Sequence, residues 1–193
     1  MSNLSSEDRL RLLHSKLDEC GETLLYLIAE YDETGETMKT VLELVSEDQH
    51  HHLLSVQMTG YQGTPLHWVC AYNNGAVLEV IMRLVTSEQT RYKFLQLLGS
   101  LGDTPLHTAA RRNKTQVFRI IHDSVSSHHF IHLLTITNLR ECTPVQTASM
   151  FGHQEAVKTL QDCHSTALIG IALQQTDPKG IAITDDNNKN AIF

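Results

Sequence analysis

Residues 104–107 read Thr-Pro-Leu-His, and the same four residues occupy positions 64–67 in the same order. An altered copy, Thr-Pro-Val-Gln, stands at 143–146, and a degenerate one, Thr-Leu-Leu-Tyr, at 23–26. The first residues of the four copies are 41, 40 and 39 residues apart. Self-similarity at a fixed period is typical of proteins whose units bury their apolar faces only against their neighbours. The sequence therefore predicts a row of about four stacked units.

Within each unit the pattern predicts two helices joined by a left-handed turn. Small or apolar pairs occupy the fifth and sixth places after each first residue: Ile28-Ala29, Val69-Cys70, Ala109-Ala110 and Ala148-Ser149. The ninth places hold residue types that tolerate a positive φ, namely Asp32, Asn73, Asn113 and Gly152, so we expect the first helix to end there. Apolar residues with helical spacing then resume. In the first unit they begin about two places late, at Met38, which predicts a longer turn.

The Thr-Pro pair suits the start of a helix. A threonine hydroxyl can cap unpaired backbone amides, and proline lacks the N–H that would go unpaired at the first helical position. The imidazoles of His67 and His107 can bridge between units. Thr-Pro-Leu-His, a small pair and then a Gly or Asn turn resembles the ankyrin repeat, whose usual period is about 33 residues. The resemblance covers roughly residues 6–163 and implies an all-α solenoid of stacked helix pairs.

The period here is longer than that of the ankyrin repeat, and the added residues have a pattern of their own. A serine followed by an acidic residue or a second serine precedes an apolar pair four times: Ser6-Glu7, Ser46-Glu47, Ser87-Glu88 and Ser126-Ser127. Serine before an acidic residue is a helix-start signal. We therefore expect a short extra helix between the second helix of each repeat and the next loop.

The repeat pattern also divides the chain. We expect an N-terminal capping helix and loop over 1–22, ankyrin repeats over 23–163 that start near residues 23, 64, 104 and 143, and a C-terminal cap and disordered tail over 164–193. A terminal repeat departs from the pattern because its outer face meets water. The segment 165–173 is the candidate capping helix, and we expect disorder after about Thr184.

Composition and charge disfavour several classes of partner. The 193 residues carry 15 basic and 22 acidic side chains, a formal charge of −7, with no basic run suited to nucleic acid. No long apolar segment predicts a membrane span or a leader peptide. The four cysteines lack the spacing of a disulfide framework or metal site, so we expect reduced thiols in the cytosol or nucleus.

The ankyrin resemblance also implies where a partner would bind. In that family the variable contact positions are the two residues after the small pair, together with the loop tips. These positions correspond here to Glu30, Tyr31, Ala71, Tyr72, Arg111, Arg112, Met150 and Phe151. Tyr, Arg, Met and Phe are enriched in protein interfaces. Arg111 and Arg112 could bind an acidic or phosphorylated segment, or they could be solvated or pair with nearby carboxylates.

Other candidate sites receive simpler interpretations. Trp68, the only tryptophan, is expected to pack against an adjacent first helix. His50, His51 and His52 point around a helix and not to one side of it, so we interpret the histidines as surface residues and predict no metal site. No phosphate loop, nucleophile elbow or acidic dyad is present, and we predict neither catalysis nor a cofactor.

Two hypotheses for function remain open. The first is a monomeric, non-enzymatic adaptor, scaffold or inhibitor that binds a protein on the concave face of the stack. The loop Thr137-Asn138-Leu139-Arg140, which stands before Cys142-Thr143-Pro144, is similar to the loop before a repeat in inhibitors of the NF-kappa-B type. The second is a structural segment or truncated copy of a longer array, in which the apolar run from Ala167 to Leu173 contacts a further repeat.

Overall fold

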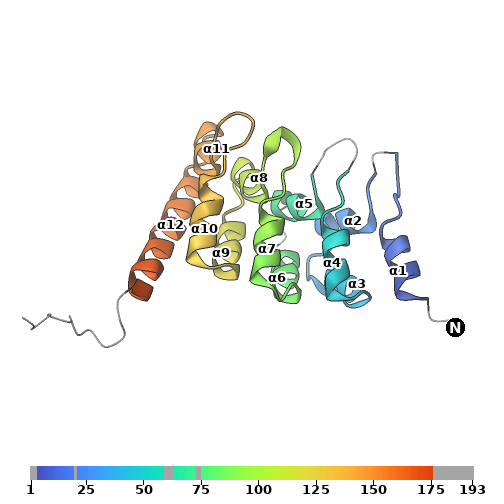
Figure 1. The fold of residues 1–193 in the computed structure, drawn as a ribbon. Coiled ribbons are helices and arrows are strands. Elements are labelled where there is room, and N and C mark those ends of the chain that lie inside the picture. The colour runs from blue at the N-terminus through green and yellow to red at the C-terminus, as the bar shows by residue number, and fades with distance from the viewer. Residues whose placement is uncertain (1–3, 20, 59–62, 73–74, 176–193) are drawn as a thin grey trace, which may run out of the picture.

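The computed structural model describes residues 4–19, 21–58, 63–72 and 75–175. Within these ranges the chain forms twelve α-helices and one short 3₁₀ helix, with no strand. The prediction of an all-α solenoid is confirmed. Figure 1 shows the helices stacked along one direction, from α1 at one end to α12 at the other.

The helices fall into three rows that repeat along the stack. The first helices are α2 (Leu24–Tyr31), α5 (Pro65–Tyr72), α8 (Pro105–Arg111) and α11 (Pro144–Met150). The second helices are α3 (Glu36–Glu43), α6 (Gly75–Leu84), α9 (Thr115–Ser124) and α12 (Gln154–Gln175). The inserted third helices are α1 (Ser6–Leu13), α4 (Glu47–Leu54), α7 (Glu88–Leu95) and α10 (Ser127–Thr135). Loops that we call arms connect each third helix to the next first helix, and one arm contains the 3₁₀ helix η1 (Ser100–Gly102) (Figure 1).

The core lies between equivalent helices of successive repeats. Helix α8 packs between α5 and α11, and α9 packs between α6 and α12. Ala109, Ala110, Val117, Phe118 and Ile121 are each 0% exposed there. Full burial of a large apolar side chain contributes about 1.5–3 kcal/mol. Because these contacts cross repeat boundaries, a single repeat would lose much of its core without its neighbours.

The threonines begin the first helices as predicted. Thr104 Oγ1 accepts a hydrogen bond from the backbone N–H of His107 at 3.4 Å, and Thr143 Oγ1 accepts one from Gln146 at 3.3 Å. In turn, the His107 side chain accepts a hydrogen bond from the backbone N–H of Thr104 at 3.2 Å, and the Gln146 side chain accepts one from that of Thr143 at 2.8 Å. Each pair is a capping box that satisfies donors at the helix start.

The two histidines also bridge to the next repeat, as expected. Nε2 of His67 lies 2.9 Å from the backbone oxygen of Asp103, and Nε2 of His107 lies 2.9 Å from that of Cys142. A carbonyl oxygen only accepts, so each Nε2 donates while Nδ1 accepts from the capping threonine, which requires the neutral tautomer. Burial lowers the pKa of His67 to about 4 and also lowers that of His107. Both imidazoles are therefore uncharged structural links.

The turns between first and second helices match the prediction at two of three described positions. Asn113 and Gly152 have φ values of 56° and 75°. The prediction was wrong at Asp32, whose φ is −82°. There the left-handed residue is Gly35, with φ 78°, while the Asp32 carboxylate accepts from the backbone N–H groups of Gly35 and Met38 at 2.9 Å each. This turn is one residue longer than the turn after α8, as expected, and Asn73 lies outside the described residues.

The inserted third helices are present where the serine pattern placed them. Ser87 and Ser126 accept hydrogen bonds from backbone N–H groups in the first turns of α7 and α10, and Ser46 forms a capping box. In α1 the cap is Ser5, one residue earlier than expected. Consecutive third helices are also linked, because Glu47 at the start of α4 accepts from Thr86, whose N–H and hydroxyl lie 2.9 and 2.6 Å away.

The C-terminal end differs from the expected arrangement. The predicted boundary at residue 163 falls inside α12, which runs without a break through the segment 165–173. The helix continues because α10 provides a surface for its second half, where Gly170 allows close approach to the Ser127 side chain. The predicted disordered tail after Thr184 lies outside the described residues.

Candidate partner-binding surface

Four exposed side chains occupy equivalent places at the ends of the first helices. Tyr31 and Tyr72 are the last residues of α2 and α5, and Arg112 and Phe151 are the C-cap residues of α8 and α11. Tyr31 is 71% exposed, Tyr72 46% and Phe151 42%, and Arg112 is also exposed. Because the four helices pack side by side, these residues form a line that we call the end row. Met150 is exposed beside Phe151.

Glu30 lies between the two tyrosines of the end row. A hydrogen bond to the Glu30 carboxylate raises the pKa of Tyr31. Burial raises the pKa of Tyr72, and the charge of the same carboxylate adds to the effect. Both phenols therefore stay protonated at neutral pH, and the N-terminal part of the row presents aromatic rings around one half-buried negative charge.

A hollow opens between the second and third members of the row. It has a volume of about 350 Å³ and is lined by Ala71, Tyr72, Arg112 and Lys114. Sequence reasoning identified Tyr72 and Arg112 but missed Lys114, which follows the left-handed turn at Asn113. Both cations belong to the repeat that begins at Thr104. An anionic group in the hollow would contact two positive charges and an aromatic ring.

Arg111 does not belong to this exposed charge. Its guanidinium forms an ion pair with the carboxylate of Asp103, and only 20% of the Arg111 side chain is exposed. The Phe151 ring lies 5.2 Å from the guanidinium carbon, within the range of a cation–π contact. Of the two interpretations of this arginine, pairing with a nearby carboxylate is the one that the structure shows.

Asp103 joins three successive repeats. It is 5% exposed, and its Oδ1 accepts from the side-chain amide of Asn138 at 2.8 Å, in the following arm. Its other carboxylate oxygen pairs with Arg111, and its backbone oxygen accepts from His67 of the preceding repeat. Asn138 in turn accepts from the backbone N–H groups of Arg140 and Cys142 at 2.9 and 3.2 Å. These contacts link the two arms that precede α8 and α11 to each other and to the end of α8.

Comparison with known proteins agrees with this architecture. A family model for the ankyrin repeat matches residues 101–127, which span the end of an arm, α8, all of α9 and the first residue of α10. The chain therefore contains an ankyrin repeat. A chain in the crystal structure of the yeast ribosomal protein Rps3 in complex with its chaperone Yar1 has a similar fold. The TM-score is 0.56 at 20% identity, over 81% of this chain and 92% of that one. No curated protein sequence matches the chain.

The arms of the stack present apolar tips, at the loop positions where the ankyrin resemblance implies partner contacts. Leu101 is 43% exposed and Leu139 is 80% exposed. The backbone N–H of Leu139 donates to the oxygen of Leu101 at 2.9 Å, so neighbouring arms are hydrogen-bonded at their tips. Leu101 has a φ of 61°, which is unusual for a residue with a bulky side chain. Each leucine stands three or four residues before the first residue of a repeat.

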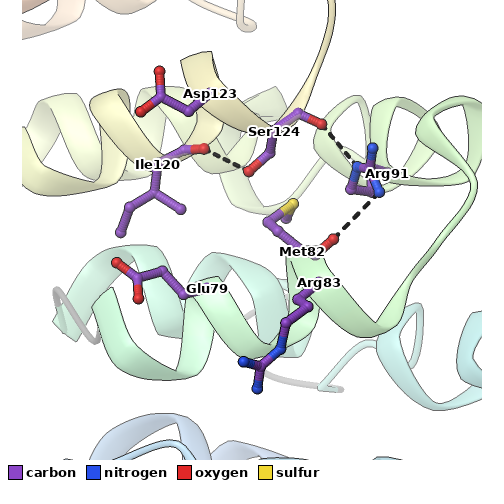
Figure 2. Close-up of a pocket in the computed structure, with 7 residues that line it drawn as sticks. All are labelled: Glu79, Met82, Arg83, Arg91, Ile120, Asp123 and Ser124. Atoms are coloured by element: carbon purple, nitrogen blue, oxygen red, sulfur yellow. Dashed lines mark hydrogen bonds between the residues drawn. The ribbon is translucent and has the colours of Figure 1, made fainter.

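A second hollow lies among the second and third helices of the ankyrin stack (Figure 2). Its volume is about 340 Å³, and it is lined by Glu79, Met82, Arg83, Arg91, Ile120, Asp123 and Ser124. Arg91 donates to backbone oxygens at the ends of two second helices, to Val85 at 2.7 Å and to Ser124 at 2.8 Å. Because Arg91 is used in this way and the other charged residues are of both signs, the hollow has no clear preference for a ligand charge.

Trp68 and the histidines have mainly structural contacts. The Trp68 ring lies 5.7 Å from that of Tyr26 on the preceding first helix, as predicted. His50 is 6% exposed and its Nε2 lies 2.9 Å from the oxygen of Leu42, so its assignment to the surface was wrong. His129 contacts the Glu88 carboxylate at 2.7 Å and stacks on Tyr92. The described part of the chain contains no group of three or more potential metal ligands and no helix long and apolar enough for a bilayer.

Proposed function

We propose that this ankyrin-repeat chain is a non-enzymatic interaction module that holds a protein partner on the concave face, against the end row and the arms. The observation that supports this most directly is the end row itself. Large exposed side chains of types common in binding hot spots occupy the same place in four consecutive repeats. A stack of this kind presents an extended surface, and it suits a partner segment that lies along several repeats.

The chemistry of the row favours a segment with an anionic centre. Arg112 and Lys114 line one hollow with Tyr72, while Met150 and Phe151 lie beyond them in the next repeat. A carboxylate or phosphate in the hollow would form charge-assisted hydrogen bonds, and apolar side chains of the partner would contact the aromatic residues on either side. Buried Cys70 and Cys163 are free thiols, which is compatible with a cytosolic or nuclear setting.

The proposal is tested in two steps. Affinity purification and mass spectrometry identify candidate partners, and calorimetry with a purified partner then compares variants of the full chain. Tyr72→Ala and Arg112→Glu should each weaken binding by about 2 kcal/mol, or about thirtyfold, if these residues are hot spots. Lys158→Glu, an exposed charge reversal on α12, is the matched control. Arg111→Glu is unsuitable because it would leave the Asp103 carboxylate without its ion pair.

Two results would count against the end row. Binding as tight as wild type in both Tyr72→Ala and Arg112→Glu would place the partner elsewhere. Equal weakening by Lys158→Glu would indicate a general charge effect in place of a local contact. Melting temperatures of all three variants, measured in parallel, separate loss of binding from loss of fold.

One observation favours the alternative that the chain is a segment of a longer array. Leu168, Ile169 and Leu173 on α12 are 49%, 61% and 67% exposed, which a further repeat could cover. Against it, the exposed residues in the first half of the same helix are polar, including Glu155 and Lys158. Light scattering decides between them, because an uncovered stacking face should produce self-association that increases with concentration, and an adaptor should remain monomeric.

A further inference from the structure

The N-terminal end of the stack is only partly covered. Helix α1 occupies the place of a third helix, since its cap Ser5 corresponds to the serine caps of α4, α7 and α10. Arg9 donates to the oxygen of Leu44 at 2.8 Å beyond the end of α3, just as Arg91 donates to Ser124 at the end of α9. No described first or second helix precedes α2 and α3, while α5 and α6 have α2 and α3 in front of them (Figure 1).

The residues that stacking buries elsewhere are exposed at this end. Thr37 of α3 is exposed, whereas Val77 in α6 and Val117 in α9, which follow it at intervals of 40 residues, are each 0% exposed. Leu24 at the start of α2 is 37% exposed, while the proline in the same place of α5 is buried. This face of α2 and α3 therefore corresponds to the face that a preceding repeat covers elsewhere in the stack, but no described first or second helix packs on it.

The exposed side of α2 is an apolar stripe beside a hollow. Leu24, Leu27 and Tyr31 are three and four residues apart, so they lie along one side of the helix. Leu27 and Tyr31, together with Ile28, Asp32 and Thr37, line a hollow of about 390 Å³. A helix laid against α2 would place apolar side chains three or four residues apart on this stripe and in the hollow.

The stretch of chain that contains this hollow is strongly negative, and Asp32 lines the hollow itself. Residues 15–43 contain eight acidic and two basic side chains, a net charge of −6, whereas the whole chain has a net charge of −7. The remaining residues are thus almost neutral. The pKa of Glu22 is raised by burial and by the nearby carboxylates of Asp18 and Glu30, which shows that these acidic groups lie close enough to repel one another.

We propose that this end of the stack binds a basic amphipathic helix of a partner protein. The apolar side of that helix packs on Leu24, Leu27 and Tyr31 and fills the hollow at Thr37. Its lysine and arginine residues lie near the surrounding carboxylates, where they relieve the repulsion among them. The site shares Tyr31 with the end row. It differs from the proposed anion-binding centre at Arg112 and Lys114 in both location and charge, so the two would engage different parts of a partner.

The test uses the full chain and three labelled peptides, measured by fluorescence anisotropy at low and high salt. The first is a 20-residue amphipathic helix with leucines on one side and lysines on the other. The second has the same composition with the leucines scattered, and the third has glutamate in place of lysine. We expect measurable binding of the first peptide, at least about tenfold weaker binding of the second, and no binding of the third. Binding should weaken with salt.

Matched variants locate the site. Thr37→Arg places a long cationic side chain in the hollow and should weaken binding of the first peptide at least about tenfold. Thr166→Arg, the same change at an exposed position of α12, should leave binding unchanged. Glu33→Gln removes one exposed charge near the hollow and should weaken binding about threefold at low salt. Phe151→Ala, which tests the end row, should have no effect on this peptide.

Either of two results would overturn the proposal. Equal binding of the first two peptides would mean attraction by charge alone, without a site. Equal effects of Thr37→Arg and Thr166→Arg would place the peptide elsewhere. Circular dichroism shows whether Thr37→Arg unfolds the chain. If it does, Glu33→Gln is compared with Glu155→Gln on α12, and equal affinity of these two variants for the first peptide would exclude the N-terminal face as the binding site.

Discussion

Replacement of Asp103 by asparagine should destabilise the stack through the loss of one buried ion pair. The Asp103 carboxylate is 7% exposed and pairs with Arg111, whose side chain is 20% exposed. Removing one partner of a fully buried pair costs about 3–5 kcal/mol. Because the arginine keeps some contact with water, we expect Asp103→Asn to cost about 2 kcal/mol, which is typical of a buried polar group that loses its partner. The asparagine side-chain oxygen can still accept from Asn138.

Urea unfolding followed by circular dichroism measures this change in the free energy of unfolding. A cost of about 2 kcal/mol corresponds to a fall in melting temperature of about 4–8 °C for a chain of this size. A double-mutant cycle with Arg111→Met isolates the pair, and we expect a coupling energy of about 1–2 kcal/mol. Asp103→Ala should cost about 1 kcal/mol more than Asp103→Asn, because Asn138 then also loses an acceptor. The reasoning fails if Asp103→Asn is equally costly with and without Arg111.

Three further changes test the repeat contacts. Gly152→Ala should cost about 1–2 kcal/mol for a positive φ alone, since a methyl group there meets nothing within 4 Å. Gly35→Ala should cost more, because its Cβ would lie 2.9 Å from a backbone oxygen of the next repeat, and equal losses in urea unfolding would contradict this contact. Hydrogen bonds from the start of α10 lower the pKa of Glu88 to about 2, so the ionised carboxylate stabilises the fold above its usual pKa and this stabilisation is lost as pH falls towards 2. The difference in free energy of unfolding between wild type and Glu88→Gln should therefore shrink over that range. A difference that stays constant would exclude this contribution. Burial lowers the pKa of His67 from 6.5 to about 4, so the unfolded chain binds more protons between these pH values and the free energy of unfolding should fall from pH 6.5 to pH 4. His67→Gln, which introduces the residue type found at Gln146, should make this fall with pH smaller. An unchanged dependence on pH would show that other groups cause it.

Much of the fold could be predicted because its signals are local. Threonine specifies a helix start through its side-chain hydroxyl, which caps a backbone N–H, and proline does so through its missing N–H. Asn113 and Gly152 specify a turn through their tolerance of positive φ. The serine caps of the third helices are equally local. The prediction was wrong at Asp32, where the longer turn lets the side chain cap the next helix while Gly35 takes the left-handed conformation.

The candidate site could be predicted only in part. The repeat period placed Tyr31, Tyr72, Arg112 and Phe151 at equivalent positions, which is why they lie in one row. The period could not show that Arg111 pairs with Asp103, because that ion pair joins a helix end to the arm that precedes the helix and depends on how the arm folds back. Lys114 was missed for a related reason, since its side chain reaches a hollow shared with the preceding repeat.

The sequence by itself determined the number of repeats, the starts of the helices and the inserted third helix, because each depends on a few neighbouring residues that recur about every 40 positions. Tertiary structure alone decided which charges remain exposed, where the arms are fixed and which end of the stack is left partly uncovered. Those properties depend on contacts between residues about 35 to 40 positions apart, such as Asn138 with Asp103, and burial is a property of the assembled stack and not of any one repeat.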